Sequence, residues 1–220
     1  ICVMADYRVI IPHLLTREGG LSKDPDDNAS AYPVPDGSGY HTNKGVTWKT
    51  FVNLASKIGY TATPQLFYAM PSDIWGKIYK LGFWDQFKGD TIQAQSVANM
   101  FADGFWIGGG SKQVKAVQTF LKSQGYNVSV DGVCGPQTVA AINKFCSDAV
   151  KQKTLLDVAY NAQMSFFQSL PDWPTFKNGW TARFQSLYTF SLDFLKKNSS
   201  TLVIATVLLF GAGVWYFSKK

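Results

Sequence analysis

Apolar residues recur every three or four positions along most of the chain, which is the spacing of one face of an α-helix. This pattern predicts helices over 9–17, 50–58, 72–81, 91–106, 111–123, 136–168 and 181–195. Residues 21–46 interrupt it, because they are rich in Asp, Pro, Gly, Ser and Asn, and they predict a long loop or a short hairpin. Residues 169–180 predict an irregular, aromatic-rich connection. The fold class that we expect is therefore mainly α.

The end of the chain follows a different pattern. Residues 198–218 include no charged residue, and residues 201–217 read TLVIATVLLFGAGVWYF. The 21 uncharged residues from 198 to 218 would span about 31 Å as a helix, close to the ~30 Å core of a bilayer. We predict a hinge over 196–200 and a transmembrane helix over 201–217 that binds a lipid bilayer. Lysine pairs flank both sides, so the orientation stays open.

Composition narrows the classes of protein without selecting one. The chain has 220 residues, 46% of them hydrophobic, which suffices for a core and excludes a disordered protein. The net charge of +6 is not clustered, so it suits an anionic polymer or surface, and we predict no nucleic-acid partner. The short apolar run 9–11 does not form the core of a signal peptide, so secretion by a cleaved leader is not expected.

The metal-binding residue types are few. The chain has three cysteines and two histidines without metal-ligand spacing, so we predict neither a metal nor a cofactor. We interpret the cysteines as small buried thiols, with a bridge between Cys134 and Cys146 left open.

Glu18 is the first candidate for chemistry. It follows the apolar stretch 9–17 and precedes Gly19 and Gly20, and paired glycines commonly close a helix. Partial negative charge at a helix C-terminus and loss of water both raise the pKa of a carboxyl group. A carboxylic acid still protonated near neutral pH is what a glycosidase uses to protonate a leaving oxygen. The alternative is a solvated glutamate at a helix end.

Asp27 and Thr42 are the next candidates. Asp27 ends the run Asp24-Pro25-Asp26-Asp27, and Thr42 begins the motif Thr42-x-x-Gly45-Val46-Thr47. Two carboxyl groups that flank a sugar bond, one protonated and one ionised, are the minimum for glycoside hydrolysis. The Thr42 hydroxyl would hold the attacking water beside the second carboxylate.

These motifs, together with Ile92-x-x-Gln95-Ser96-Val97-Ala98-Asn99, resemble glycoside hydrolase family 108, the muramidases of phages and bacteria with a lysozyme-like helical fold. The resemblance implies that Glu18 is the general acid, that Asp27 orients or deprotonates water, and that Thr42 assists. Family members usually have a short Gly-Gly link where this chain has residues 28–41. The carboxylates that would substitute for Asp27 are Asp24, Asp26 and Asp36.

A second block lies further along the chain. Its residues are Ala116-Val117-Gln118-x-Phe120-Leu121, Val130-Asp131-Gly132-Val133-x-Gly135-Pro136-x-Thr138 and Ala141-Ile142. It resembles the helical peptidoglycan-binding motif of the same enzymes, and Phe176-x-x-Gly179-Trp180-x-x-Arg183 resembles their closing segment. The alternative is that these residues only build a turn. We predict a catalytic part over 5–107 and a peptidoglycan-binding-like part over 108–195.

Three further residues are candidates for contact with a glycan. Trp106 lies beside Gly108-Gly109-Gly110, and Asp103 and Asn99 precede it by three and seven positions, so all three can share one helix face. Sugar rings stack on flat aromatic faces. We therefore predict that Asn99, Asp103 and Trp106 bind substrate.

Together these features predict a membrane-anchored muramidase, a lysozyme or endolysin of a bacteriophage that degrades cell-wall peptidoglycan. The anchor would lie in the virion membrane of a lipid-containing phage or in the inner membrane of the host. The alternative is a catalytically inactive lysozyme-like scaffold that binds the wall from a membrane. A pore-forming lysis protein is less favoured, because a single helix needs no folded domain of this size.

Overall fold

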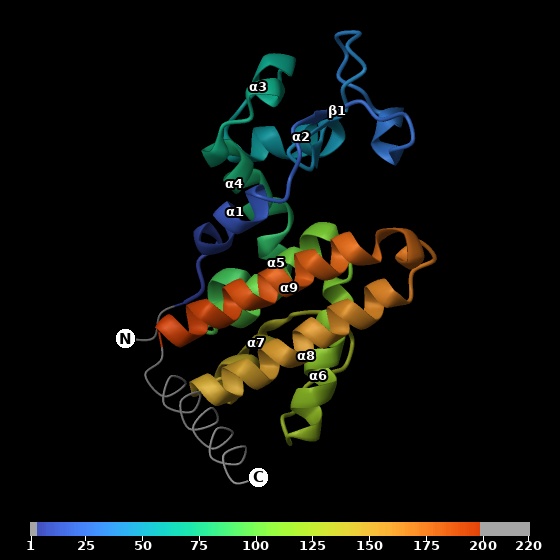
Figure 1. Ribbon diagram of the computed structural model, residues 1–220. Coiled ribbons are helices and arrows are strands. Elements are labelled where there is room, and N and C mark those ends of the chain that lie inside the picture. Colours follow the sequence, from blue (N-terminus) through green and yellow to red (C-terminus); the bar gives the residue numbers. More distant parts are fainter. Residues whose placement is uncertain (1–3, 199–220) are drawn as a thin grey trace. The chain divides into compact units, whose positions relative to one another are not determined.

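The computed structural model describes residues 4–198, which form two compact units (Figure 1). The N-terminal unit consists of residues 7–86, and the C-terminal unit of residues 4–6 and 87–198.

The N-terminal unit combines short helices with a small sheet. Its elements are α1 (Tyr7–Leu15), β1 (Leu21–Ser22), η1 (Asn28–Ala31), β2 (Thr42–Asn43), β3 (Val46–Thr47), α2 (Trp48–Ala55), η2 (Ser56–Ile58), α3 (Pro64–Ala69) and α4 (Ser72–Gly82). The one-turn helix η3 (Trp84–Phe87) follows and ends one residue past this unit. The sequence pattern did not reveal α3, which begins after Thr63, a residue whose hydroxyl accepts the backbone N–H of Leu66.

Aromatic packing holds the middle of this unit. The rings of Phe51 and Phe67 are fully buried with centroids 5.4 Å apart, and Trp48 packs on both. Trp75 is also buried, and its indole N–H donates to the Lys44 carbonyl over 2.9 Å. Buried aromatic rings contribute large apolar areas, so these contacts fix α2 and α4 against the sheet.

The expected hairpin is present. Strands β1, β2 and β3 form one antiparallel sheet, with Ser22 paired to Thr42 and Thr42 paired to Thr47. The two-residue turn between β2 and β3 has positive φ at both positions, 47° at Lys44 and 75° at Gly45. Such turns match the twist of paired strands, and glycine adopts them without steric cost.

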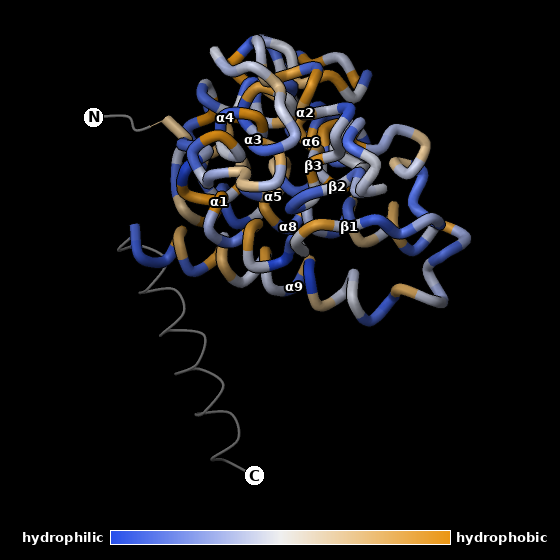
Figure 2. The backbone as a smooth tube through the Cα atoms, turned by 90° about the horizontal axis from the view of Figure 1, so that it is seen from above, coloured by the Kyte–Doolittle hydropathy of each residue, from blue (hydrophilic) through white to orange (hydrophobic). Residues whose placement is uncertain are grey.

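The C-terminal unit is a bundle of helices. Its elements are η4 (Gly89–Thr91), α5 (Gln95–Ile107), α6 (Gly110–Ser123), α7 (Pro136–Phe145), α8 (Ala149–Gln168) and α9 (Trp173–Lys197). Every residue of α5 from Gln95 to Gly104 is buried, and α5 packs on α6, α8 and α9. Figure 2 shows hydrophobic and hydrophilic stretches alternating along the chain, as the helical spacing predicts. The prediction of a mainly helical fold is confirmed.

Two helix predictions in this unit need correction. The predicted helix over 136–168 is two helices, because Asp148 caps α8 by accepting the backbone N–H of Lys151 over 2.9 Å. The predicted irregular connection is shorter than expected, since α9 already begins at Trp173. Pro174 is compatible with this start, because a first-turn N–H has no partner within the helix.

The predicted hinge and membrane helix reach beyond the described residues. Lys196 and Lys197 still belong to α9, so the first part of the predicted hinge is helical. The helix predicted over 201–217 lies outside the described residues. Within residues 4–198, none of the helices has both the length and the apolar composition needed to cross a bilayer.

Candidate active site

Glu18 lies between α1 and β1, where it is half-buried. Helix α1 ends at Leu15, two residues before the predicted end at residue 17. Its last turn is closed by the Arg17 N–H, which donates to the Leu14 carbonyl over 2.8 Å, and neither Gly19 nor Gly20 has a positive φ. The prediction that these glycines close the helix was therefore wrong, because closure comes from the residues before Glu18.

Strand pairing brings the segment after Glu18 beside the hairpin. The Lys44 N–H donates to the Gly20 carbonyl over 3.2 Å, next to the pairing of β1 with β2. Two residues of chain extend at most about 7 Å, so the backbone of Glu18 lies within that distance of Gly20.

Asp27 is exposed at the start of η1. Its Oδ1 accepts the backbone N–H of Ala29 over 2.9 Å, which makes Asp27 the N-cap of this short helix. Its Oδ2 lies 3.9 Å from Nδ1 of His41. The carboxylate is thus held at one oxygen by the backbone, while the other oxygen faces the imidazole.

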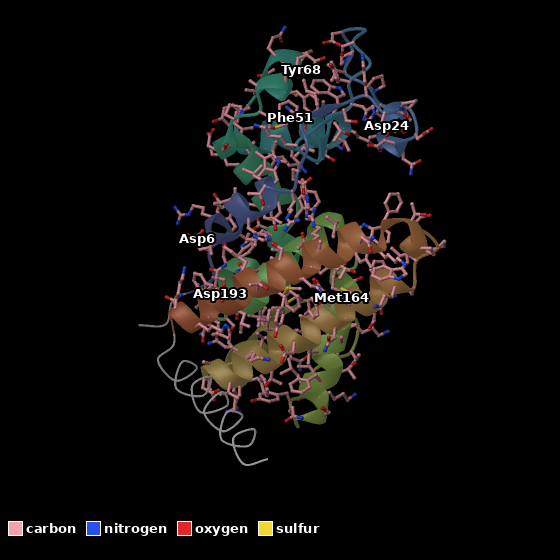
Figure 3. All side chains as sticks on the ribbon, viewed as in Figure 1. Asp6, Asp24, Phe51, Tyr68, Met164 and Asp193 are labelled. Carbon is pink, nitrogen blue, oxygen red and sulfur yellow. The ribbon has the colours of Figure 1, made fainter. Side chains whose placement is uncertain are left out.

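His41 joins Asp27 and Thr42, although no role was predicted for it. Its ring is 1% exposed, and Nδ1 lies 3.0 Å from the Thr42 hydroxyl. Its Nε2 lies 3.0 Å from the Asp24 carbonyl oxygen (Figure 3 labels Asp24). The structure therefore gathers Asp27, His41 and Thr42, and the signal for His41 was its position directly before the threonine motif.

The other candidate carboxylates have different surroundings. Asp24 Oδ1 accepts the backbone N–H of Asp26 over 3.0 Å. Asp36 accepts hydrogen bonds from Ser38 and from the Tyr68 hydroxyl, and these bonds lower the pKa of the Asp36 carboxyl group. Asp27 is therefore the one of the four whose carboxylate faces the His41 ring, which in turn contacts Thr42. Among residues 4–198, no three His, Cys, Asp or Glu side chains gather as metal ligands.

The predicted glycan-binding residues lie on α5 in the C-terminal unit. Asn99 is fully buried, and its side-chain oxygen Oδ1 accepts a hydrogen bond from Nε2 of Gln95 over 2.8 Å. Asp103 is 2% exposed and paired with Arg183, whereas Trp106 is half-buried. Asn99 and Asp103 are thus buried against neighbours within the unit, and their contact with substrate stays a prediction. Trp106 alone of the three has the exposure that stacking requires.

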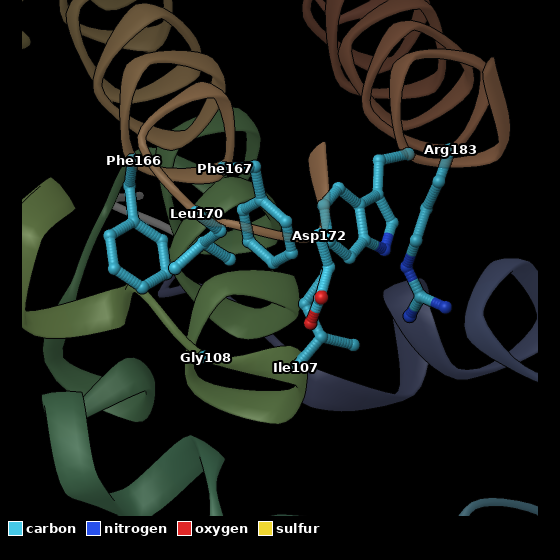
Figure 4. Close-up of a pocket in the computed structure, with 8 residues that line it drawn as sticks. Ile107, Gly108, Phe166, Phe167, Leu170, Asp172 and Arg183 are labelled. Atoms are coloured by element: carbon cyan, nitrogen blue, oxygen red, sulfur yellow. The ribbon is translucent and has the colours of Figure 1, made fainter. Parts of the chain in front are cut away.

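A cavity of about 340 Å³ lies between the ends of α5, α8 and α9 (Figure 4). The rings of Phe166, Phe167 and Trp180 line it together with Asp172 and Arg183. Aromatic faces with a few polar groups are typical of small-ligand sites. The aromatic-rich segment 169–180 was its signal in the sequence.

The second sequence block forms a turn built on a buried glutamine. The side-chain carbonyl of Gln118 accepts the backbone N–H groups of Asp131 and Gly132 over 3.0 and 2.8 Å. Its amide donates to Asp131, to the Val133 carbonyl and to the Thr138 hydroxyl. These contacts give the block a structural role, which was one of the two predicted alternatives beside peptidoglycan binding.

Two family models match consecutive parts of the chain. Residues 11–109 match the model of the family Glycosyl hydrolase 108, and residues 112–185 match that of a family described as Predicted Peptidoglycan domain. No curated protein sequence matches the chain.

Among solved structures, the one titled "Structure of Brucella abortus SagA" is similar over 86% of this chain and 95% of its own. The TM-score is 0.61 and the sequence identity is 24%, so this likeness shows the fold alone. Residues 11–109 thus match a Glycosyl hydrolase 108 domain and are followed by a match to a peptidoglycan domain, so the chain is a glycoside hydrolase that acts on peptidoglycan.

Proposed function

We propose that the chain is an N-acetylmuramidase that cleaves the β-1,4 bond between N-acetylmuramic acid and N-acetylglucosamine. Glu18 donates its proton to the bridging oxygen as the bond from C1 of the muramic acid breaks. A water molecule adds to C1, and its proton passes to Asp27. Thr42 orients this water. Atoms and charge balance, because one carboxyl group gives the proton that the other receives.

The observation that carries this proposal is the joining of Asp27 to Thr42 through His41. Asp27 and Thr42 are 15 positions apart in the sequence, yet both contact one buried imidazole. Glu18 precedes the strand that pairs with Thr42. An acid and a water-orienting pair on adjoining segments are what glycoside hydrolysis needs.

Fragments released from purified peptidoglycan test the reaction. Reduction with labelled borohydride followed by mass analysis should reveal reducing muramic acid ends. Reducing glucosamine ends would reject the proposed bond, and cut peptides would reject a glycosidase. Absence of any release by the wild type would favour the alternative, an inactive wall-binding scaffold.

Single substitutions test the residue roles. Glu18→Gln keeps the shape of the side chain but removes the acid, so release should fall by at least about 100-fold. Asp27→Asn should also lower release strongly. Asp26→Asn removes a neighbouring charge from the same exposed run and serves as the matched control, which should retain near wild-type release.

We also propose that the enzyme is a bacteriophage product anchored in a membrane of the virion or the host. The uncharged residues 198–218 and their lysine flanks support this proposal. Flotation of the full chain with liposomes tests it. Leu208→Asp with Leu209→Asp should abolish flotation, because each charge costs about 2.5–3.5 kcal/mol at the centre of a membrane helix. Flotation of this variant at the wild-type level would reject the anchor.

A further inference from the structure

We infer that His41 is a positioning residue that fixes the Thr42 hydroxyl as a hydrogen-bond acceptor toward the water activated by Asp27. This inference rests on the proposed function of Asp27 and Thr42. The contacts of the His41 ring determine its tautomer, that is, which ring nitrogen carries the hydrogen.

The contact at Nε2 decides which nitrogen carries the proton. Nε2 of His41 lies 3.0 Å from the carbonyl oxygen of Asp24. A backbone carbonyl only accepts, so Nε2 must carry a hydrogen and donate it. In the neutral ring, Nδ1 then has no hydrogen and is an acceptor.

The tautomer in turn orients Thr42. Its hydroxyl lies 3.0 Å from Nδ1, so in the neutral state the hydroxyl donates to the ring. A threonine hydroxyl has a single hydrogen and two lone pairs. With that hydrogen directed at His41, Thr42 can only accept a hydrogen bond from a water molecule.

The Asp27 carboxylate, like the Thr42 hydroxyl, can accept a hydrogen bond from the same water molecule. Its Oδ1 is occupied by the N–H of Ala29, and Oδ2 lies 3.9 Å from the His41 ring. A carboxylate is also an acceptor. A water molecule that donates one hydrogen to Asp27 and the other to Thr42 keeps a lone pair directed away from both, as attack on C1 requires.

The His41 side chain can be changed without removing the backbone contacts of the hairpin. The His41 N–H donates to the Ser22 carbonyl over 3.0 Å, and its carbonyl accepts the Trp48 N–H over 2.7 Å. These bonds do not involve the ring. The side chain therefore acts through its two nitrogen contacts, which can be tested separately.

Two amide variants separate those contacts. In His41→Asn the side-chain oxygen reaches the position of Nδ1 and can accept the Thr42 hydroxyl, but the bond to Asp24 is lost. In His41→Gln the side-chain nitrogen reaches the position of Nε2 and keeps the bond to Asp24, but the acceptor for Thr42 is lost. Release of reducing ends should stay within about threefold of wild type in His41→Asn and fall at least about tenfold in His41→Gln.

The reverse order would overturn the inference, because it would show that His41 acts only by holding the loop at Asp24. Equal loss in both variants, or wild-type release in both, would also overturn it. Thr42→Val alone should lower release as far as His41→Gln does, and the double variant should lose no more than either single one. Additive losses would contradict a shared role.

A measurement that does not need activity covers the case in which a variant fails to fold. Long-range ¹H–¹⁵N spectra of the wild type should show His41 with hydrogen on Nε2 and none on Nδ1. The opposite tautomer would overturn the inference. If this tautomer is found while Glu18→Gln keeps wild-type release, the proposed function fails and the proton arrangement of His41 stands.

Discussion

Arg183 donates twice to a single oxygen of Asp103. Its Nε lies 2.9 Å and its Nη2 2.6 Å from Oδ1 of the carboxylate. The Asp103 side chain is 2% exposed and that of Arg183 15%, so the pair is largely removed from water. It joins α5 to α9 across 80 positions of sequence. The charge of Asp103 is therefore compensated from within the C-terminal unit.

Removal of Arg183 should destabilise the protein strongly. Arg183→Met leaves the buried Asp103 carboxylate without its cation, and breaking a buried pair in this way costs about 3–5 kcal/mol. We expect a loss of that size in the free energy of unfolding, measured by urea denaturation. Arg183→Lys should lower the free energy of unfolding by less, because lysine keeps the positive charge. It should still lower it, because lysine cannot make both contacts.

An exposed pair on the same helix provides the control. Nζ of Lys196 lies 3.6 Å from Oδ1 of Asp193 at the surface of α9. Lys196→Met should change the free energy of unfolding by less than about 1 kcal/mol, since exposed pairs contribute little. A similar loss of unfolding free energy in Arg183→Met and Lys196→Met would contradict the stabilising role of the buried pair.

Hydrophobic spacing predicted most of the helices, because burial on one face leaves a direct trace in the sequence. It missed the break at 146–148 because Phe145 and Ala149 continue the apolar spacing across Asp148. It missed the start of α9 because Pro174 and the aromatic residues after it are typical of irregular chain as well. A local cap, that of Asp148, decided the first of these boundaries.

The site was only partly predictable for a related reason. Glu18, Asp27 and Thr42 were found because their types and order indicate chemistry. The burial of Asn99 and the partner of Asp103 depend on residues distant in sequence, such as Arg183, so helix-face spacing could not distinguish a surface position from a packed one. His41 was missed because its role depends on the fold of the loop that carries Asp24 and Asp27.

The turn held by Gln118 should be sensitive to one side chain. Gln118→Ala leaves the N–H groups of Asp131 and Gly132 without their acceptor. An unsatisfied buried group costs about 1–3 kcal/mol, so we expect a loss of at least about 2 kcal/mol in the free energy of unfolding. Urea denaturation measures it, and Gln124→Ala at the exposed end of the same helix is the control. Equal stability of the two variants would refute the structural role.

Asp36 should make stability depend on acidity. Its pKa is lowered by hydrogen bonds from the Ser38 side chain, from Tyr68 and from the Ser38 backbone. A group with a lowered folded-state pKa stabilises the fold above its unfolded pKa, about 3.9, and loses that contribution as the pH falls through the lower folded value. Tyr68→Phe should therefore be less stable than wild type at neutral pH.

The difference in stability between wild type and Tyr68→Phe should become smaller as the solution is acidified below about pH 3. Thermal denaturation across that range measures it. Tyr32→Phe, at an exposed tyrosine, should show no such narrowing. A difference that stays constant with pH would mean that the Tyr68 hydroxyl does not stabilise ionised Asp36.

The two described cysteines should resist modification in the folded protein. Cys134 and Cys146 are free thiols, and burial raises the pKa of each to about 12. At pH 8 only about one molecule in ten thousand then carries either reactive thiolate. Peptide-resolved mass analysis after iodoacetamide should find both unmodified in native protein and both modified in concentrated guanidinium chloride without reductant. Protection that persists in the denaturant would instead indicate a bridge between them, and rapid native labelling would show that the thiols are accessible.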